Sequence, residues 1–172
     1  MNKKLQISDD SGFIGLANLS QYNSFISADW DFDQLKSRII EQTNKNNILF
    51  WSTGREDLWE VEIITNNEFA QKNFFRNEEA LIQVTENKLH LVNYETLSMA
   101  AQFQHIKLPE DHLKELDIEL ENGFYIVEFC QIKNPTKMAK KKEVDFQIRL
   151  EKIENKTEYY PNNFGNIFWH LQ

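Results

Sequence analysis

The side chains that most often carry catalysis or bind metals are few in this sequence and widely spaced. Its four histidines, His90, His105, His112 and His170, show no zinc-motif spacing, and the single cysteine, Cys130, is adjacent to none of them. Cys130 lies in an alternating apolar run near acidic residues, whereas a reactive cysteine needs positive charge beside it. These residues predict no metal site and no cofactor.

Two groups of acids suggest metal chemistry at first sight. Residues 29–33 carry three aspartates as a calcium loop does, but Gln34 and Ile40 stand where that loop needs Gly and a bidentate Glu. Asp145 with Glu154 and Lys156 supplies the residue types of a metal-dependent nuclease, although one strand separates them. A hydrolase or nuclease with a dispersed site is therefore an alternative, while the missing catalytic motifs favour a non-enzymatic protein.

The pattern with the clearest chemical meaning is a row of carboxylates at a spacing of two. These residues, called the acidic row below, are Glu115, Asp117, Glu119 and Glu121. Carboxylates at this spacing project from one side of a β-strand, which suits the binding of a basic partner. They also suit an ordinary solvated strand face.

Asn122-Gly123 follows the acidic row and separates two alternating runs, which predicts a β-hairpin. A two-residue turn would pair Glu121 with Phe124 and would place Asp117 opposite Glu128. One face of the hairpin would then be apolar, formed by Leu116, Ile118, Leu120, Tyr125, Val127 and Phe129. The other face would bring an apolar centre next to the acids, so the predicted binding residues are Glu115, Asp117, Glu119, Glu121, Phe124, Ile126 and Glu128.

The elements that must position these residues are mostly strands. A second hairpin is expected at residues 80–93 with its turn at Glu86-Asn87, which would place Val84 opposite Leu89 and His90 opposite Gln83. Other strands are expected at residues 13–19, 48–51, 59–63, 144–150 and 164–172.

One helix is expected at about residues 31–43, because Asp31 and Gln34 form a capping-box pattern before an apolar face. The segment 97–103 is ambiguous, and 133–142 reads as a lysine-rich loop. Together these elements predict a single mainly-β domain over residues 1–172, an antiparallel β-sandwich with one helix. A mixed α+β sheet is the alternative.

The composition of the chain indicates its cellular compartment and the kind of partner it could bind. The net charge of −8 is uneven, with −11 over residues 1–132 and +3 over 133–172. An acidic body repels nucleic acids and anionic membranes and attracts basic proteins. A lone cysteine and the lack of an apolar leader or long apolar span predict a cytoplasmic protein. The 13 Phe and 4 Trp leave a small-ligand-binding sandwich as a further alternative.

Two segments, 81–91 and 116–127, resemble the small bacterial DNA-entry nuclease inhibitor (competence inhibitor) family, in which one hairpin is followed by another containing Gly-Tyr. The resemblance implies a bacterial protein that binds and blocks a nuclease or toxin, as immunity proteins do. It agrees with the acidic row in predicting a basic protein partner, and it leaves the oligomeric state undetermined.

Overall fold

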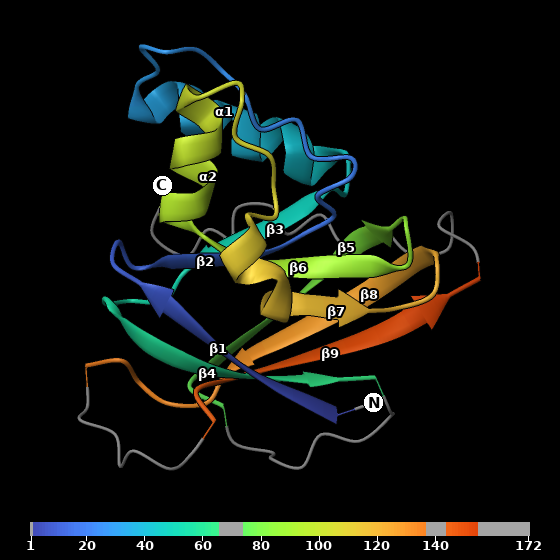
Figure 1. The fold of residues 1–172 in the computed structure, drawn as a ribbon. Helices are drawn as coiled ribbons and strands as arrows, with labels where there is room; N and C mark the ends of the chain where they lie inside the picture. The colour runs from blue at the N-terminus through green and yellow to red at the C-terminus, as the bar shows by residue number, and fades with distance from the viewer. Residues whose placement is uncertain (1, 66–73, 137–143, 155–172) are drawn as a thin grey trace.

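The computed structural model describes residues 2–65, 74–136 and 144–154 of the 172-residue chain. It is a two-sheet β-sandwich with helices on one side (Figure 1). The fold class predicted from the sequence is therefore confirmed. The strand expected at 164–172 lies outside the described residues, and so does much of the lysine-rich loop.

One sheet has five strands in the order β1-β4-β9-β8-β5. The strands are β1 (Asn2–Asp9), β4 (Asp57–Ile64), β9 (Phe146–Ile153), β8 (Gly123–Gln131) and β5 (Arg76–Val84). Its pairs are antiparallel except for β4 and β9, which run parallel. The four-stranded sheet is antiparallel in the order β3-β2-β6-β7, formed by β3 (Ile48–Ser52), β2 (Phe13–Ala17), β6 (Lys88–Asn93) and β7 (Asp117–Glu119).

The main core lies between the sheets, where alternate side chains of both are buried, among them Trp51, Trp59, Phe129 and Phe146. A second apolar cluster lies on the outer face of the four-stranded sheet, under α1 (Phe32–Asn44) and α2 (Tyr94–Gln102). Figure 1 shows both helices on this side. A 3₁₀-helix, η1 (Asp111–Leu116), precedes β7. No helix in the described ranges has the length and apolarity to cross a bilayer.

Helix α1 begins as its sequence predicts. The carboxylate of Asp31 accepts from the Gln34 N–H at 2.8 Å, and the Gln34 side chain accepts from the Asp31 N–H at 3.0 Å. This reciprocal pair satisfies donors that a helix start leaves open. Leu35 and Ile39 are buried as expected, but Phe32 is 47% exposed. The apolar face of α1 is thus narrower than the one predicted.

The hairpin predicted around Asn122-Gly123 is wrong, because β7 and β8 belong to different sheets. Ile118 lies opposite Leu89 of β6, while Val127 lies between Ala80 of β5 and Leu150 of β9. The chain does turn at Gly123, where φ is +149°. It turns there from one sheet to the other, so the apolar side chains of both segments enter one core from opposite sides.

The second predicted hairpin is half right. Its turn lies at Glu86-Asn87 as expected, with φ of +53° and +58°, and a single bridge joins Thr85 to Lys88. Beyond the bridge the strands separate, because β5 joins the five-stranded sheet and β6 the other. As a result Val84 faces Gly123 instead of Leu89, and His90 faces Ala17 and Asp117 instead of Gln83.

The other predicted strands are found at β2, β3, β4 and β9, and every residue of β3 is buried, as its continuous apolar run implies. The ambiguous segment 97–103 is largely helical in α2. Strand β1 was not predicted, although Leu5 and Ile7 alternate with polar residues and both are buried.

Candidate protein-binding site

The acidic row does not lie on a single strand. Glu115 is exposed on η1, Asp117 and Glu119 belong to β7, and Glu121 follows in the connection to β8. Among the strands that the structure describes, β7 is the edge of its sheet and pairs only with β6. The row therefore runs along an exposed border of the sandwich.

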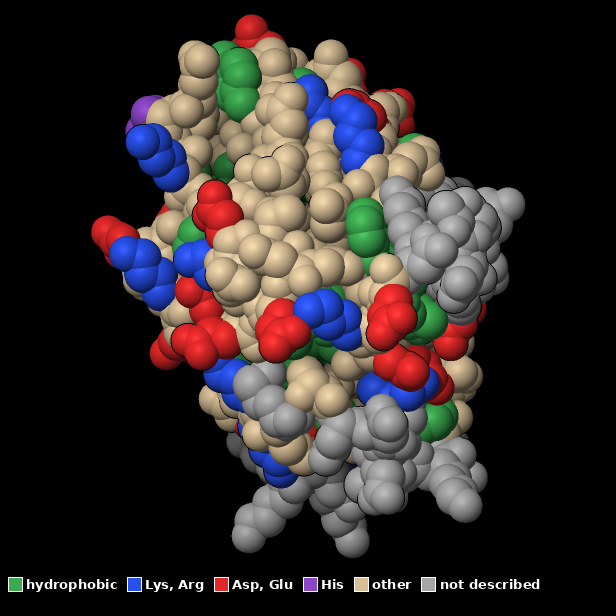
Figure 2. Space-filling view, turned by 90° about the vertical axis from the view of Figure 1, so that its right-hand side faces the viewer, with side chains coloured by type: hydrophobic (Ala, Val, Ile, Leu, Met, Phe, Trp, Pro, Cys, Tyr) green, Lys and Arg blue, Asp and Glu red, His purple; other side chains and the backbone are tan. Residues whose placement is uncertain are grey.

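Three members of the row line an open pocket of about 540 Å³. The pocket is completed by the turn before β6 and is lined by Glu86, Asn87, Lys88, Asp117, Glu119, Leu120 and Glu121. We call its charged residues, Glu86, Lys88, Asp117, Glu119 and Glu121, the acidic corner. Figure 2 views the molecule from this side and shows Asp and Glu side chains in a band, with Lys and Arg among them.

The acidic corner is built where two sheet-to-sheet connections touch. The side-chain oxygen of Asn122 accepts from the Asn87 N–H at 2.7 Å, and the Leu120 N–H donates to the Asn87 carbonyl at 2.9 Å. These bonds hold the 85–88 turn against the chain that leaves β7. Glu86 is thereby brought beside residues more than 30 positions later in the sequence.

Internal cations neutralise only part of this charge. Lys152 contacts Glu121 at 2.7 Å, and this hydrogen bond lowers the pKa of the Glu121 carboxyl. Lys88 lies 3.8 Å from Asp117. Within the described residues, Glu86 and Glu119 form no ion pair, although Glu119 lies opposite Lys88 in the β-ladder. Four carboxylates against Lys88 inside the pocket leave its lining negative.

His90 lies beneath Asp117 and is 2% exposed. Its Nδ1 contacts the Asp117 carboxylate. Burial lowers the pKa of the His90 imidazole, and the nearby Asp117 charge opposes that effect. The neutral ring can donate its Nδ1 proton to Asp117, which holds that carboxylate in place without cancelling its charge.

The predicted β8 residues are not in the pocket. Phe124, Ile126 and Glu128 alternate with buried core residues and so lie on the outer face of the five-stranded sheet. Glu128 is not opposite Asp117: it faces Arg149 of β9, whose guanidinium donates to it at 2.8 Å. The seven residues expected to form one surface are thus divided between the η1–β7 border, with its connection to β8, and the outer face of the five-stranded sheet.

Sequence reasoning missed Glu86 and Lys88 as site residues. Both flank Asn87 in a turn that was recognised, but nothing local shows that this turn contacts residues 117–121. Only the separation of β5 from β6 and of β7 from β8 brings them together.

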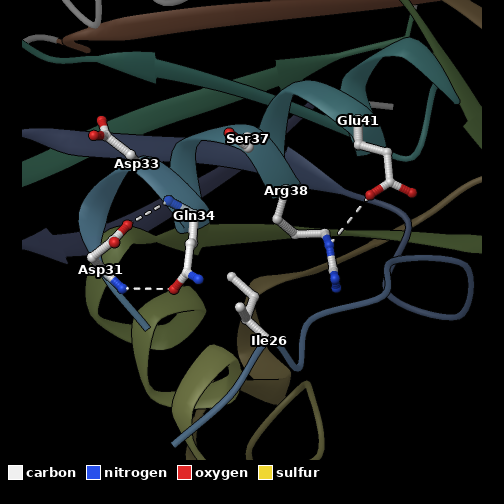
Figure 3. Close-up of a pocket in the computed structure, with 7 residues that line it drawn as sticks. All are labelled: Ile26, Asp31, Asp33, Gln34, Ser37, Arg38 and Glu41. Atoms are coloured by element: carbon white, nitrogen blue, oxygen red, sulfur yellow. Dashed lines mark hydrogen bonds and ion pairs between the residues drawn. The ribbon is translucent and has the colours of Figure 1, made fainter. Parts of the chain in front are cut away.

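A second pocket, of about 370 Å³, lies along α1 (Figure 3). Its polar groups mainly hold the helix in place. Asp31 caps the helix, and Arg38 contacts Glu41 at 3.4 Å while it donates to the carbonyls of Asn23 and Phe25. This pocket therefore offers less unpaired charge than the acidic corner.

Groups with the potential for bond-breaking chemistry are dispersed. Across the described ranges, no three His, Cys, Asp or Glu side chains are arranged to hold a metal ion. Cys130 is buried, and burial raises the pKa of its thiol to about 12, which leaves it protonated. Asp145 is half-buried and accepts from the Glu60 N–H at 3.0 Å, while Lys156 lies outside the described residues.

Comparison with solved structures shows the same fold in two other proteins. One is ComJ from Bacillus subtilis, an inhibitor of the DNA-degrading activity of NucA, which is similar over 88% of this chain and 96% of its own with 14% identity and a TM-score of 0.54. The other, described as crocagin biosynthetic gene J, has 13% identity and a TM-score of 0.57 over 88% of this chain and 95% of its own. No protein-family model matches this sequence, and no curated protein matches it.

The first of these similarities confirms the resemblance drawn from segments 81–91 and 116–127 at the level of fold. Both segments are therefore placed within a known architecture, although the strand pairing differs from the predicted one.

Proposed function

We propose that this protein is a non-enzymatic inhibitor or immunity protein that binds a basic nuclease or toxin through its acidic corner. The observation that carries the proposal is the open pocket lined by four carboxylates, of which Glu86 and Glu119 form no ion pair within the described residues. Uncompensated charge at an open surface accelerates the encounter with a protein of opposite charge and favours its correct orientation. The fold that this chain shares with ComJ, itself an inhibitor of a nuclease, supports a protein partner of that kind.

Two further features of the chain agree with this role. Residues 1–132 carry a charge of −11, so the long-range field has the same sign as the pocket. The buried cysteine needs no oxidising compartment, which suits action in the bacterial cytoplasm.

The test starts from affinity capture in a lysate of the native host at low ionic strength, using the full chain. We expect one basic protein in stoichiometric amount, and nuclease or toxin activity of that protein should fall when the purified chain is added. Association should slow steeply as salt is raised, because steering depends on unscreened charge. Failure to recover a stoichiometric partner at low salt would contradict the proposal.

A charge-matched pair of variants locates the surface. Replacement of Glu86 and Glu119 by Gln removes the two corner carboxylates without internal ion pairs and should weaken binding about tenfold. Replacement of Asp33 and Glu56 by Asn and Gln removes the same charge elsewhere on the surface and should change affinity by less than about twofold. Equal losses in both variants would show that only net charge matters and would remove the corner from the proposal.

A further inference from the structure

Strand β1 leaves one of its two edges open. It ends the five-stranded sheet, and among the described strands it pairs only with β4, over its full length from Asn2 to Asp9. The carbonyl of Ser8 accepts from the Asn93 side chain at 2.8 Å, so it points away from β4. Since backbone groups of successive residues alternate sides, those of Asn2, Lys4 and Gln6 point away as well.

Among the strands of residues 2–65, 74–136 and 144–154, none pairs with this edge. Within the described residues, the backbone groups of Asn2, Lys4 and Gln6 form no hydrogen bond outside their own sheet, and all three side chains are exposed. Figure 1 shows β1 at the front of the five-stranded sheet. An edge on which Asn2, Lys4 and Gln6 present free N–H and C=O groups is a template for a further strand.

At the opposite edge of the same sheet, hydrogen bonds join β5 to neighbouring segments. The Gln83 N–H of β5 donates to the Asn46 carbonyl at 2.9 Å, and Arg76 donates to the Ser52 carbonyl of β3 at 2.6 Å. The Gln83 N–H and the Ser52 carbonyl are therefore engaged within the molecule. In the described part of the chain, β1 contacts the other sheet through the Lys3 side chain and the Ser8 carbonyl. The backbone groups of Asn2, Lys4 and Gln6 between them stay available to a second chain.

The charges along β1 favour pairing with the β1 strand of a second copy of this chain. Lys3 and Lys4 lie near its start, whereas Asp9 and the exposed Asp10 lie at its end. Lys3 donates to the Asp117 carbonyl of its own chain, so Lys4 is the lysine that faces the other copy. An antiparallel partner with the same sequence brings the basic end of each copy to the acidic end of the other, and a parallel one would oppose like charges. Asp9 is already hydrogen-bonded inside its own chain, so Asp10 is the acid that faces the other copy.

We propose that two copies of this protein associate through antiparallel pairing of their β1 strands, which joins the two five-stranded sheets into one. The two-fold axis passes beside Gln6, so that Gln6 faces its symmetry mate and Lys4 faces Ser8. This register pairs the free N–H and C=O groups of Lys4 and Gln6 with the edge of the other copy and keeps each side chain on its own face of the sheet. The Ser8 carbonyl, which already accepts from Asn93, accepts the Lys4 N–H with its second lone pair. Lys4 then lies diagonal to Asp10 of the other copy, within reach of a long side chain.

The association should be weak. One strand pair buries less surface than a stable interface, and two bodies of charge −8 repel each other. We therefore expect a dissociation constant of about 10–500 µM in about 0.15 M salt, where screening limits that repulsion. Sedimentation of the purified full chain over this range should show its mass rising from 20.5 kDa toward twice that value.

Three variants test the interface itself. Gln6→Pro removes an N–H that makes no bond to β4 and should abolish dimers, while Gln6→Thr keeps the N–H and should retain them. Lys4→Glu should weaken the dimer several-fold, and Lys4→Glu with Asp10→Lys should restore it. The charge variants decide the question if the proline variant does not fold.

A mass of one chain at every concentration would overturn the proposal, and so would dimers that survive Gln6→Pro. The outcome is independent of the proposed function, because the acidic corner lies on β6, β7 and their connections.

Discussion

Asp9→Ala should destabilise the protein more than the loss of a single contact would suggest. The Asp9 carboxylate is completely buried and accepts four hydrogen bonds. One oxygen accepts from the backbone N–H groups of Ser11 and Phe13 at 3.1 and 2.9 Å. The other accepts from the Thr53 hydroxyl at 2.8 Å and the Trp59 indole N–H at 3.1 Å. The carboxylate thus ties together the β1–β2 turn, the end of β3 and the start of β4.

The magnitude follows from the donors that alanine would leave without an acceptor. The Trp59 side chain is buried, so its N–H should cost about 1–3 kcal/mol when unpaired. The Thr53 hydroxyl retains the Arg55 carbonyl at 2.7 Å as an acceptor. The other two donors are the backbone N–H groups of Ser11, which is exposed, and Phe13, which is half-buried at the start of β2, so water can replace the carboxylate more easily there. With the lost charge-assisted bonds, the free energy of unfolding should fall by about 3–5 kcal/mol.

Urea unfolding followed by tryptophan fluorescence measures this change, provided that the slope with denaturant stays constant. Asp10→Ala, one residue later and exposed, is the control and should change stability by less than about 0.5 kcal/mol. In a Trp59→Phe background, which lacks the indole donor, Asp9→Ala should cost about 1 kcal/mol less. A loss below about 1 kcal/mol for Asp9→Ala alone would refute the reasoning.

Three further predictions concern single residues. Cys130 should not react with a thiol reagent at pH 8 in the native protein, and it should react on unfolding, because burial raises its pKa to about 12. Gly15→Ala should destabilise the protein by about 1–3 kcal/mol in thermal unfolding, because a Cβ there would lie 2.7 Å from the Leu49 carbonyl oxygen. Burial and the adjacent Glu128 raise the pKa of Glu79, so its ionisation opposes folding as pH rises past the value in the unfolded chain. Glu79→Gln should therefore stabilise the protein at pH 7 and have little effect at pH 3, and equal effects at both pH values would contradict this assignment.

The sequence predicted local features well. The Asp31–Gln34 pair marks the start of α1, the turn at Glu86-Asn87 is real, and β3 is buried on both faces. These features depend on residues within a few positions of one another. The helical state of 94–102 and the strand at 2–9 were missed because their local signals are weak.

Strand pairing could not be predicted, for a physical reason. Alternation shows which side chains enter the core, and that is the same whether a chain folds back as a hairpin or crosses between two sheets. Ile118 and Val127 are both buried as predicted, yet they enter the core from opposite sheets. The partners of each strand depend on residues far away in sequence, and so the predicted contact between Asp117 and Glu128 failed.

The same limit applies to the candidate site. The acidic row indicated a negative surface, and three of its members do line the pocket. Glu86 and Lys88 joined them only through the contact between two turns. The acidic row predicted that the surface is negative, but it did not predict which residues line the pocket.

The bonds that join Asn87 to Asn122 and Leu120 have a consequence for recognition. They set the contour of the acidic corner before any other molecule arrives, so little backbone freedom remains to be lost on docking. Recognition should then resemble the meeting of two rigid surfaces, with free and bound backbones that superimpose closely.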